Sequence, residues 1–247
     1  MALAELRIEA GCSAWGAGLY GRTMYHFARS LELATDTDDT YLQVLALRHA
    51  GLASVEHGHP DDGLKMLQCA QARTWEIPRH DQRAVIVGVS GRAAAEAVCL
   101  QESATALARL GDLGAAFTAL AKGRDLWTPT RSDLFGDMDR GAARLELERG
   151  RLDVAEARAV ASVHRWEGGR QLGRTASGAV LATVYVTAGD SRGLPLAHRA
   201  ITDAGKLGSV RVRRLCVGPL ADALDNRPGA DARDLARQAR QIATARA

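Results

Sequence analysis

Aromatic residues are scarce in this 247-residue chain, in which phenylalanine, tryptophan and tyrosine together make up 4%. The strands of a β-sandwich favour β-branched and aromatic side chains, so this shortage argues against an all-β fold. The hydrophobic share is nevertheless an ordinary 47%. It must come mainly from alanine, leucine and valine, which suit close packing of helix on helix. The length is ample for a sizeable core.

Lysine is also rare and occurs only as Lys65, Lys122 and Lys206. Arginine therefore carries most of the positive charge, and the formal net charge is only +3. We attribute this arginine bias to the base composition of the genome. A nucleic-acid interface needs a strongly basic patch, whereas here the two signs of charge nearly balance. We therefore expect no direct binding of nucleic acid by this chain.

The chain has no closely spaced cysteine pair, no secretory signal and no membrane-spanning run. Its four cysteines are Cys12, Cys69, Cys99 and Cys216, and none forms a C-x-x-C motif. Residues 1–9 lack the apolar stretch of a signal peptide and already contain two glutamates. No apolar run approaches the ~18 residues that would cross a bilayer. These absences predict a cytoplasmic protein with free thiols and no membrane partner.

A glycine turn recurs along the chain, each time between two stretches of helical pattern. The turn glycines are Gly18, Gly58, Gly111, Gly150 and Gly189, separated by 40, 53, 39 and 39 residues. Self-similarity of this kind indicates helical hairpins stacked into a solenoid. The separations exceed the ~34 residues of a minimal tetratricopeptide unit, so extended second helices or loops are expected.

The periodicity predicts six helical pairs. They are 3–15 with 20–35, 39–57 with 61–75, 81–110 with 113–126, 133–149 with 152–167, 172–188 with 192–206, and 209–225 with 230–245. A kink is expected near Gly88 and Gly91 in the long third pair. The polar helix of the last pair is typical of a capping helix. We therefore expect repeats over 1–208 and a C-terminal cap of the same solenoid over 209–247.

Small residues recur at fixed distances from the turn glycines. Seven positions before them stand Gly11, Gly51, Ala104, Ala143 and Ala182. Five and nine positions after three of them stand Gly63 and Leu67, Ala116 and Leu120, and Ala155 and Ala159. These spacings place the residues on one helical face, where a neighbouring helix can approach closely. Leu194 and His198 break the rule, which predicts that an inserted residue shifts the fifth pair.

With its glycine turns, small-residue stripe and Tyr185, the segment 4–205 resembles the tetratricopeptide repeat (TPR) family. That resemblance implies an all-α fold, a TPR-like α-α superhelix of about five to six hairpins. The first helices of such a superhelix line a concave face that commonly holds an extended or helical peptide.

Four stretches narrow the resemblance to the repeat region of actinobacterial XRE-type helix-turn-helix transcriptional regulators. They are residues 10–15, 21–28, 133–137 and 151–156. In that family the repeats follow an N-terminal DNA-binding domain. Here the repeats begin within the first dozen residues, so we expect no recognition helix in this chain.

Residues that could support catalysis or bind a metal are few. His49, His57 and His59 are close in sequence, but they lack a convincing fourth ligand, and exposed turn histidines are expected. Ser90 lies in a pattern that fails the G-x-S-x-G nucleophile motif. We therefore expect no enzyme activity, no metal and no cofactor; an enzyme on a helical scaffold is the least favoured alternative.

The four tryptophans are expected to pack in the core, because three of them end second helices, where they could plug gaps between repeats. A ligand-lining role for one of them is left open. They are Trp15, Trp75, Trp127 and Trp166.

The register of the TPR family places a set of side chains in the concave groove. They are Arg48, Leu52, Gln101, Thr105, Arg109, Arg140 and Arg144. Arg140 and Arg144 lie four residues apart, as a carboxylate clamp requires, although intrahelical ion pairs with Asp137 and Glu148 would explain them equally. The sequence favours a regulatory or scaffolding module that binds protein or peptide, with a homodimer as an option. The alternative is the ligand- or peptide-sensing part of a transcriptional regulator.

Overall fold

The chain is described here by a computed structural model for residues 2–77, 92–126, 132–166 and 171–245. Within these ranges there are twelve α-helices, one short 3-10 helix and no strand, which confirms the all-α prediction. None of these helices is long and apolar enough to cross a membrane. The helices are α1 (Ala2–Gly16), α2 (Tyr20–Asp36), α3 (Thr40–Glu56), α4 (Pro60–Arg73), η1 (Thr74–Glu76), α5 (Arg92–Arg109), α6 (Leu113–Asp125), α7 (Ser132–Glu148), α8 (Leu152–Arg165), α9 (Gln171–Thr187), α10 (Gly193–Gly205), α11 (Val210–Asp225) and α12 (Ala230–Thr244).

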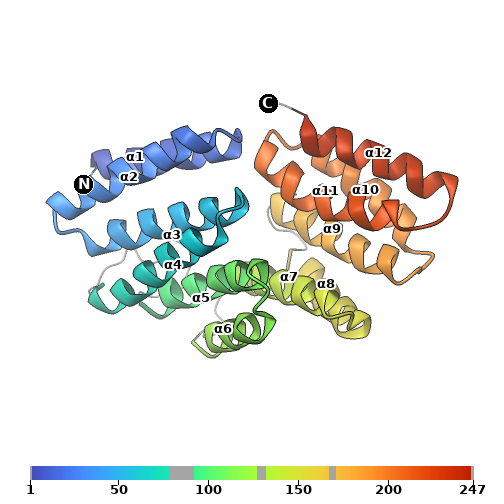
Figure 1. Ribbon diagram of the computed structural model, residues 1–247, viewed down its shortest axis with the longest axis horizontal. Helices are drawn as coiled ribbons and strands as arrows, with labels where there is room; N and C mark the ends of the chain where they lie inside the picture. The colour runs from blue at the N-terminus through green and yellow to red at the C-terminus, as the bar shows by residue number, and fades with distance from the viewer. Residues whose placement is uncertain (1, 78–91, 127–131, 167–170, 246–247) are drawn as a thin grey trace. The chain divides into compact units, whose positions relative to one another are not determined.

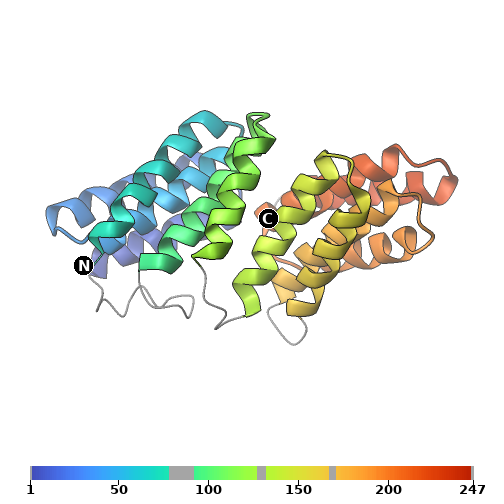
Figure 2. The ribbon, with the colours of Figure 1, turned by 90° about the horizontal axis from the view of Figure 1, so that it is seen from below.

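The helices form pairs, and the pairs are divided between two compact units. The first unit is built from α1 to α6 and the second from α7 to α12 (Figure 1). Within a unit, the second helix of one pair packs against the first helix of the next, as α2 does on α3, α4 on α5, and α8 on α9. Figure 2 shows the same layering from below. Each layer thus buries the apolar face of its neighbour, as in a repeat protein.

The five turn glycines end the first helices because they adopt a left-handed backbone. Their φ angles lie between 72° and 91°, a region that costs glycine nothing and other residues strain. The next residue then donates its N–H to a carbonyl five positions back, which satisfies an orphan group at the helix end. These bonds are Leu19 to Ala14, His59 to Ser54, Asp112 to Leu107, Arg151 to Glu146 and Asp190 to Tyr185, each at 2.9–3.0 Å.

The small residues lie where paired helices touch. A Cβ added at Gly63 of α4 would stand 2.6 Å from the carbonyl oxygen of Gly51 on α3 and 2.5 Å from a methyl of Val55. In the other pairs Ala104, Ala143 and Ala182 are at most 1% exposed. The predicted stripe is therefore the contact surface between the two helices of a pair. The backbones of the two helices approach more closely there than larger side chains would allow.

The fifth pair is shifted, but in the opposite direction from the prediction. In α10 the first two buried residues are Gly193 and Ala197, which lie four and eight positions after Gly189. A residue is thus missing from the register, not inserted. Residues 190–192 precede α10, which begins at Gly193. The first buried residue of this helix therefore follows its turn glycine by four positions, where α2, α4, α6 and α8 have five.

The last pair shares one apolar core with the pair before it. Leu220 and Leu224 of α11 and Leu235 of α12 lie in the same buried cluster as Ile201 of α10. The boundary between the compact units falls at residues 131/132, and the role of 209–247 as a cap stays a prediction. Of the long helix expected over 81–110, the described part begins at Arg92; residues 81–91, with Gly88, Ser90 and Gly91, lie outside the description.

The tryptophans divide between core and surface. Trp15 and Trp166 are 4% and 6% exposed, as expected for core residues. Trp75 is 58% exposed and lies under the guanidinium of Arg92, 4.6 Å from its ring centroid. Core packing was therefore the wrong prediction for Trp75, because η1 turns this side chain outward after α4 ends. Trp127 lies outside the described residues.

Replacing Gly63 by alanine should destabilise the first unit by about 2–4 kcal/mol, because the new methyl meets backbone atoms that cannot move alone. Gly21 is a matched control in α2, since a Cβ there meets nothing within 4 Å. Gly21→Ala should leave stability unchanged or raise it by up to about 1 kcal/mol. Urea unfolding of both variants measures the difference; equal stabilities would show that α3 and α4 do not approach as described.

Candidate functional site

The seven predicted groove residues lie on first helices, but in different units. Arg48 and Leu52 belong to α3, and Gln101, Thr105 and Arg109 belong to α5, so five of the seven lie in the first unit. The remaining two, Arg140 and Arg144, lie on α7 in the second unit. Each unit therefore has to be considered as a separate binding surface.

Arg48 is engaged by Glu102, a partner that the sequence did not reveal. Its Nε and one terminal nitrogen donate to the Glu102 carboxylate at 2.8–3.0 Å, and the two side chains are 24% and 9% exposed. Burial alone would lower the pKa of Arg48, but the attraction of Glu102 and its hydrogen bonds outweigh that effect and raise it. The ion pair links α3 to α5. Because Glu102 neutralises its charge, Arg48 is a poor ligand for a further anion.

The rest of the α5 surface offers polar side chains, of which the Thr105 hydroxyl donates to the backbone oxygen of Gln101 at 3.5 Å. Gln101, Thr105 and Arg109 follow one another at four-residue spacing, so they form one stripe along the helix. The Oε1 atom of Gln101 is buried and has no hydrogen-bond partner among the described residues. Arg109 is exposed, and the described part of the chain provides it with no ion pair. Leu52 is half-buried at the edge of the core around Trp15 and Phe27.

Arg144 donates a hydrogen bond to α11, a helix whose backbone bonding is interrupted by a proline. Its terminal nitrogen donates to the backbone oxygen of Leu215 on α11 at 2.7 Å. In an uninterrupted helix that oxygen would accept from residue 219, but Pro219 has no N–H. The guanidinium therefore replaces a missing backbone donor and connects α7 to α11. A carboxylate ligand would have to compete with this carbonyl for Arg144.

Arg140 precedes Arg144 by about one helical turn and is half-buried. The two arginines thus share a face of α7, as the carboxylate clamp requires. No structural observation tests that clamp, which stays a prediction. The side chain of Asp137, the predicted ion-pair partner of Arg140, lies outside the described residues.

The three histidines do not form a common site. His57 and His59 stack on the ring of Tyr20, with centroids 4.3 and 5.8 Å away. His49 packs instead against Phe27 and Trp15. In the described ranges of the chain, no three histidine, cysteine, aspartate or glutamate side chains are placed to hold a metal ion.

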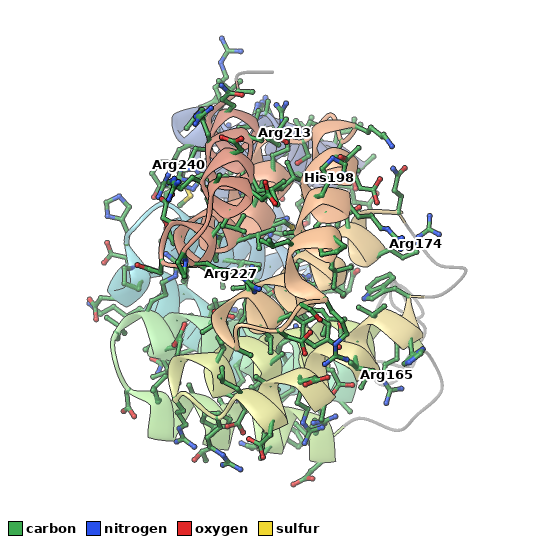
Figure 3. All side chains as sticks on the ribbon, turned by 90° about the vertical axis from the view of Figure 1, so that its right-hand side faces the viewer. Arg165, Arg174, His198, Arg213, Arg227 and Arg240 are labelled. Atoms are coloured by element: carbon green, nitrogen blue, oxygen red, sulfur yellow. The ribbon has the colours of Figure 1, made fainter. Side chains whose placement is uncertain are left out.

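Buried and surface charges of the second unit mainly connect helices. Asp139 of α7, 1% exposed, accepts from Arg158 and from Arg165, which Figure 3 labels at the end of α8. At the α9–α10 turn, hydrogen bonds from the side chain and backbone of Arg192 lower the pKa of Asp190 to about 2. The Asp139 pairs thus join the two helices of one hairpin, and the Asp190–Arg192 contact lies within one turn. Both are structural contacts and not a reactive site.

A small pocket lies beside two turns of the second unit. It has a volume of about 220 Å³ and is lined by Val186, Thr187, Gly189, Ala223, Asn226, Arg227 and Pro228. Arg227, labelled in Figure 3, donates to the backbone oxygens of Gly189 and Asp190 at the end of α9. Its charge already neutralises that helix terminus, and the volume is below that of most ligand pockets. We therefore do not assign it a ligand.

Solved structures of TPR-like proteins share this fold. The chain is similar to the nearly identical TPR-like repeats of a kinesin light chain-like protein of Podosopora anserina, with 17% identity and a TM-score of 0.51 over 80% of this chain and 93% of that one. A point variant of those repeats matches with 16% identity and a TM-score of 0.50, over 80% and 92%. The TPR2AB domain of yeast Sti1 in complex with pHSP90 scores 0.41 at 13% identity, over 98% and 97%.

A comparison with protein-family models finds no match, and neither does a comparison with curated proteins. The likeness to solved structures therefore shows the fold alone: this chain is a TPR-like helical-repeat protein in architecture. The resemblance to XRE-type regulators is not shown by these structures and stays a prediction.

Removing Arg48 should cost about 2–4 kcal/mol of unfolding free energy, because Glu102 remains buried without its cation. The paired variant Arg48→Met with Glu102→Gln should recover most of that loss, since it buries no lone charge. Arg29→Ala is the control, because Arg29 pairs with Glu32 on an exposed surface and should cost less than about 1 kcal/mol. Equal costs for Arg48→Ala and Arg29→Ala in urea titrations would contradict this assignment.

The role of Arg144 can be tested by a double-mutant cycle with Pro219. Arg144→Ala should destabilise the second unit by about 1–3 kcal/mol, because the Leu215 oxygen loses its donor. In the Pro219→Ala background the backbone N–H of residue 219 supplies that donor, so the same substitution should cost at least about 1 kcal/mol less. Thermal or urea unfolding of the four proteins gives the coupling; additive effects, within about 0.5 kcal/mol, would refute it.

Proposed function

We propose that this chain is a non-enzymatic module that binds a protein or peptide segment along its first helices. The observation that carries the proposal is the α5 stripe of Gln101, Thr105 and Arg109, in which Gln101 Oε1 has no hydrogen-bond partner and the exposed Arg109 no ion pair among the described residues. The TPR-like architecture supports it, because stacked helical pairs present an extended surface.

An extended peptide suits this stripe chemically. A glutamine amide can both donate to and accept from a peptide backbone, and the Thr105 hydroxyl, which donates to the Gln101 backbone oxygen, can accept from one. Arg109 would bind an acidic side chain or a carboxylate at one end. Leu52 of α3 would supply apolar contact next to the neutral Arg48–Glu102 pair. The segment bound here is therefore expected to be polar, with an acidic group placed near Arg109.

Further parts of the proposal rest on the sequence. We propose a cytoplasmic protein with a regulatory or scaffolding role, able to form a homodimer. In the second unit, Arg140 and Arg144 form the proposed carboxylate clamp, provided that a ligand displaces the Leu215 oxygen. The second candidate function is the ligand- or peptide-sensing part of a transcriptional regulator, and it is favoured by the XRE-like stretches at 10–15 and 21–28.

Peptides selected from a random 15-residue display library on the full chain provide the probe. For the tightest peptide, Gln101→Ala and Arg109→Ala should each weaken binding at least about 10-fold in calorimetric titrations, because each removes a hydrogen bond to a desolvated group. Arg140→Ala combined with Arg144→Ala tests the clamp in the same assay.

Arg22→Ala is the matched control, because Arg22 is an exposed arginine on the second helix α2. It should leave the affinity within about twofold, since surface charges away from a site contribute little. The α5 site is rejected if neither Gln101→Ala nor Arg109→Ala changes affinity, and the clamp is rejected if the double arginine variant, checked for folding, binds like the parent.

A further inference from the structure

The outer face of α1 exposes apolar side chains at positions that are buried in other first helices. We define the α1 end face as Leu3, Leu6, Ala10 and Ser13. Leu3 and Leu6 are 53% and 65% exposed, and Ser13 is exposed too. Residues spaced by three and four positions lie on one helical face. The four therefore form a continuous stripe along α1.

The turn glycines give the register for comparison. Leu6, Ala10 and Ser13 precede Gly18 by twelve, eight and five positions. The equivalent residues are at most 9% exposed in three other first helices. They are Ala46, Ala50 and Ala53 of α3, Cys99, Ser103 and Ala106 of α5, and Ser177, Leu181 and Val184 of α9.

In those helices the equivalent face packs on the second helix of the preceding pair. Ala53 shares a cluster with Phe27 of α2, and Ala106 shares one with Leu67 of α4. Ser177 of α9 and Ser162 of α8 are joined by a hydrogen bond of 2.7 Å between their hydroxyls. The α1 end face thus has the register of a helix-packing surface and exposes Leu6 where α3, α5 and α9 bury a side chain.

The end face continues onto α2. The Arg7 guanidinium lies 5.8 Å from the Tyr25 ring centroid and bonds to His26 at 3.3 Å, while Tyr25 is 55% exposed. Two adjacent helices of 15 and 17 residues offer a footprint of about 22 by 20 Å. A symmetric pair of such faces covers about 900 Å² in total, which is below the roughly 1,000–1,200 Å² of a stable specific interface and in the range of weak, transient contacts.

We propose that the α1 end face binds the same face of a second copy and forms a weak symmetric dimer. The C-terminal helix α12 is an unsuitable partner, because its exposed residues include Arg233, Asp234 and Arg237. Head-to-tail stacking would bury those charges against Leu6. A two-fold contact instead buries Leu6 against the apolar and small residues of the same face and closes the assembly at two copies. This interface does not depend on the α5 peptide stripe.

Sedimentation equilibrium of the full chain between about 1 and 300 µM tests the proposal. The mass should rise with concentration from 26.3 kDa towards twice that value and stop there. Leu6→Glu should raise the dissociation constant at least about 30-fold, because it buries a carboxylate without a partner. Leu3→Glu is a second variant of the same face. Ser13→Leu should tighten the dimer by extending the apolar stripe.

Leu110→Glu is the matched control, because Leu110 is also an exposed leucine, at 45%, but lies at the α5–α6 turn. It should associate like the parent. Circular dichroism should show unchanged helix content in all variants, since each side chain is exposed in the monomer. A parent chain that stays monomeric throughout, or a dimer equally stable in Leu6→Glu and Leu3→Glu, overturns the proposal.

Discussion

The close approach of paired helices at glycine and alanine is the constraint on which the rest of this structure depends. At Gly51 and Gly63 the backbones of α3 and α4 leave no room for a Cβ. In the later pairs alanine plays the same part. Close backbones bring the flanking leucines and valines into contact, so a chain with few aromatic side chains still forms dense cores. The left-handed glycines then reverse the chain at a fixed distance from each contact.

This repetition explains why the fold could be predicted well. Helix type, pairing and most boundaries follow from the turn glycines and from the 3.6-residue period, both of which are local properties. An inserted residue was predicted for α10, whereas the structure has one residue fewer between the turn glycine and the first buried residue. Leu194 and His198 show that the register of small residues breaks, but they do not show in which direction. Trp75 was misplaced for a related reason: the 3-10 turn that ends α4 changes which way its side chain points.

The candidate site was harder to predict because its chemistry depends on partners far away in the chain. Register placed Arg48 on a first helix, but it could not show that Glu102, 54 residues later, neutralises its charge. Nor could register show that the seven residues belong to two units. The register of the TPR family also selected Gln101, Thr105 and Arg109, whose four-residue spacing within one helix places them on one face; their role in a groove stays a prediction.

Arg144 shows how a structural arginine can resemble a ligand-binding one. Its spacing from Arg140 suits a clamp, yet its guanidinium meets the carbonyl that Pro219 leaves without a donor. One signal in the sequence could have indicated this role, namely a proline in the middle of a strongly helical stretch. Such a proline always frees a carbonyl four residues earlier, and a buried carbonyl requires a donor. An arginine on a neighbouring helix is the natural donor, because its five N–H groups reach where a backbone cannot. The same geometry sets the condition for any acidic ligand of the second unit: it must bind Arg144 more strongly than that carbonyl does.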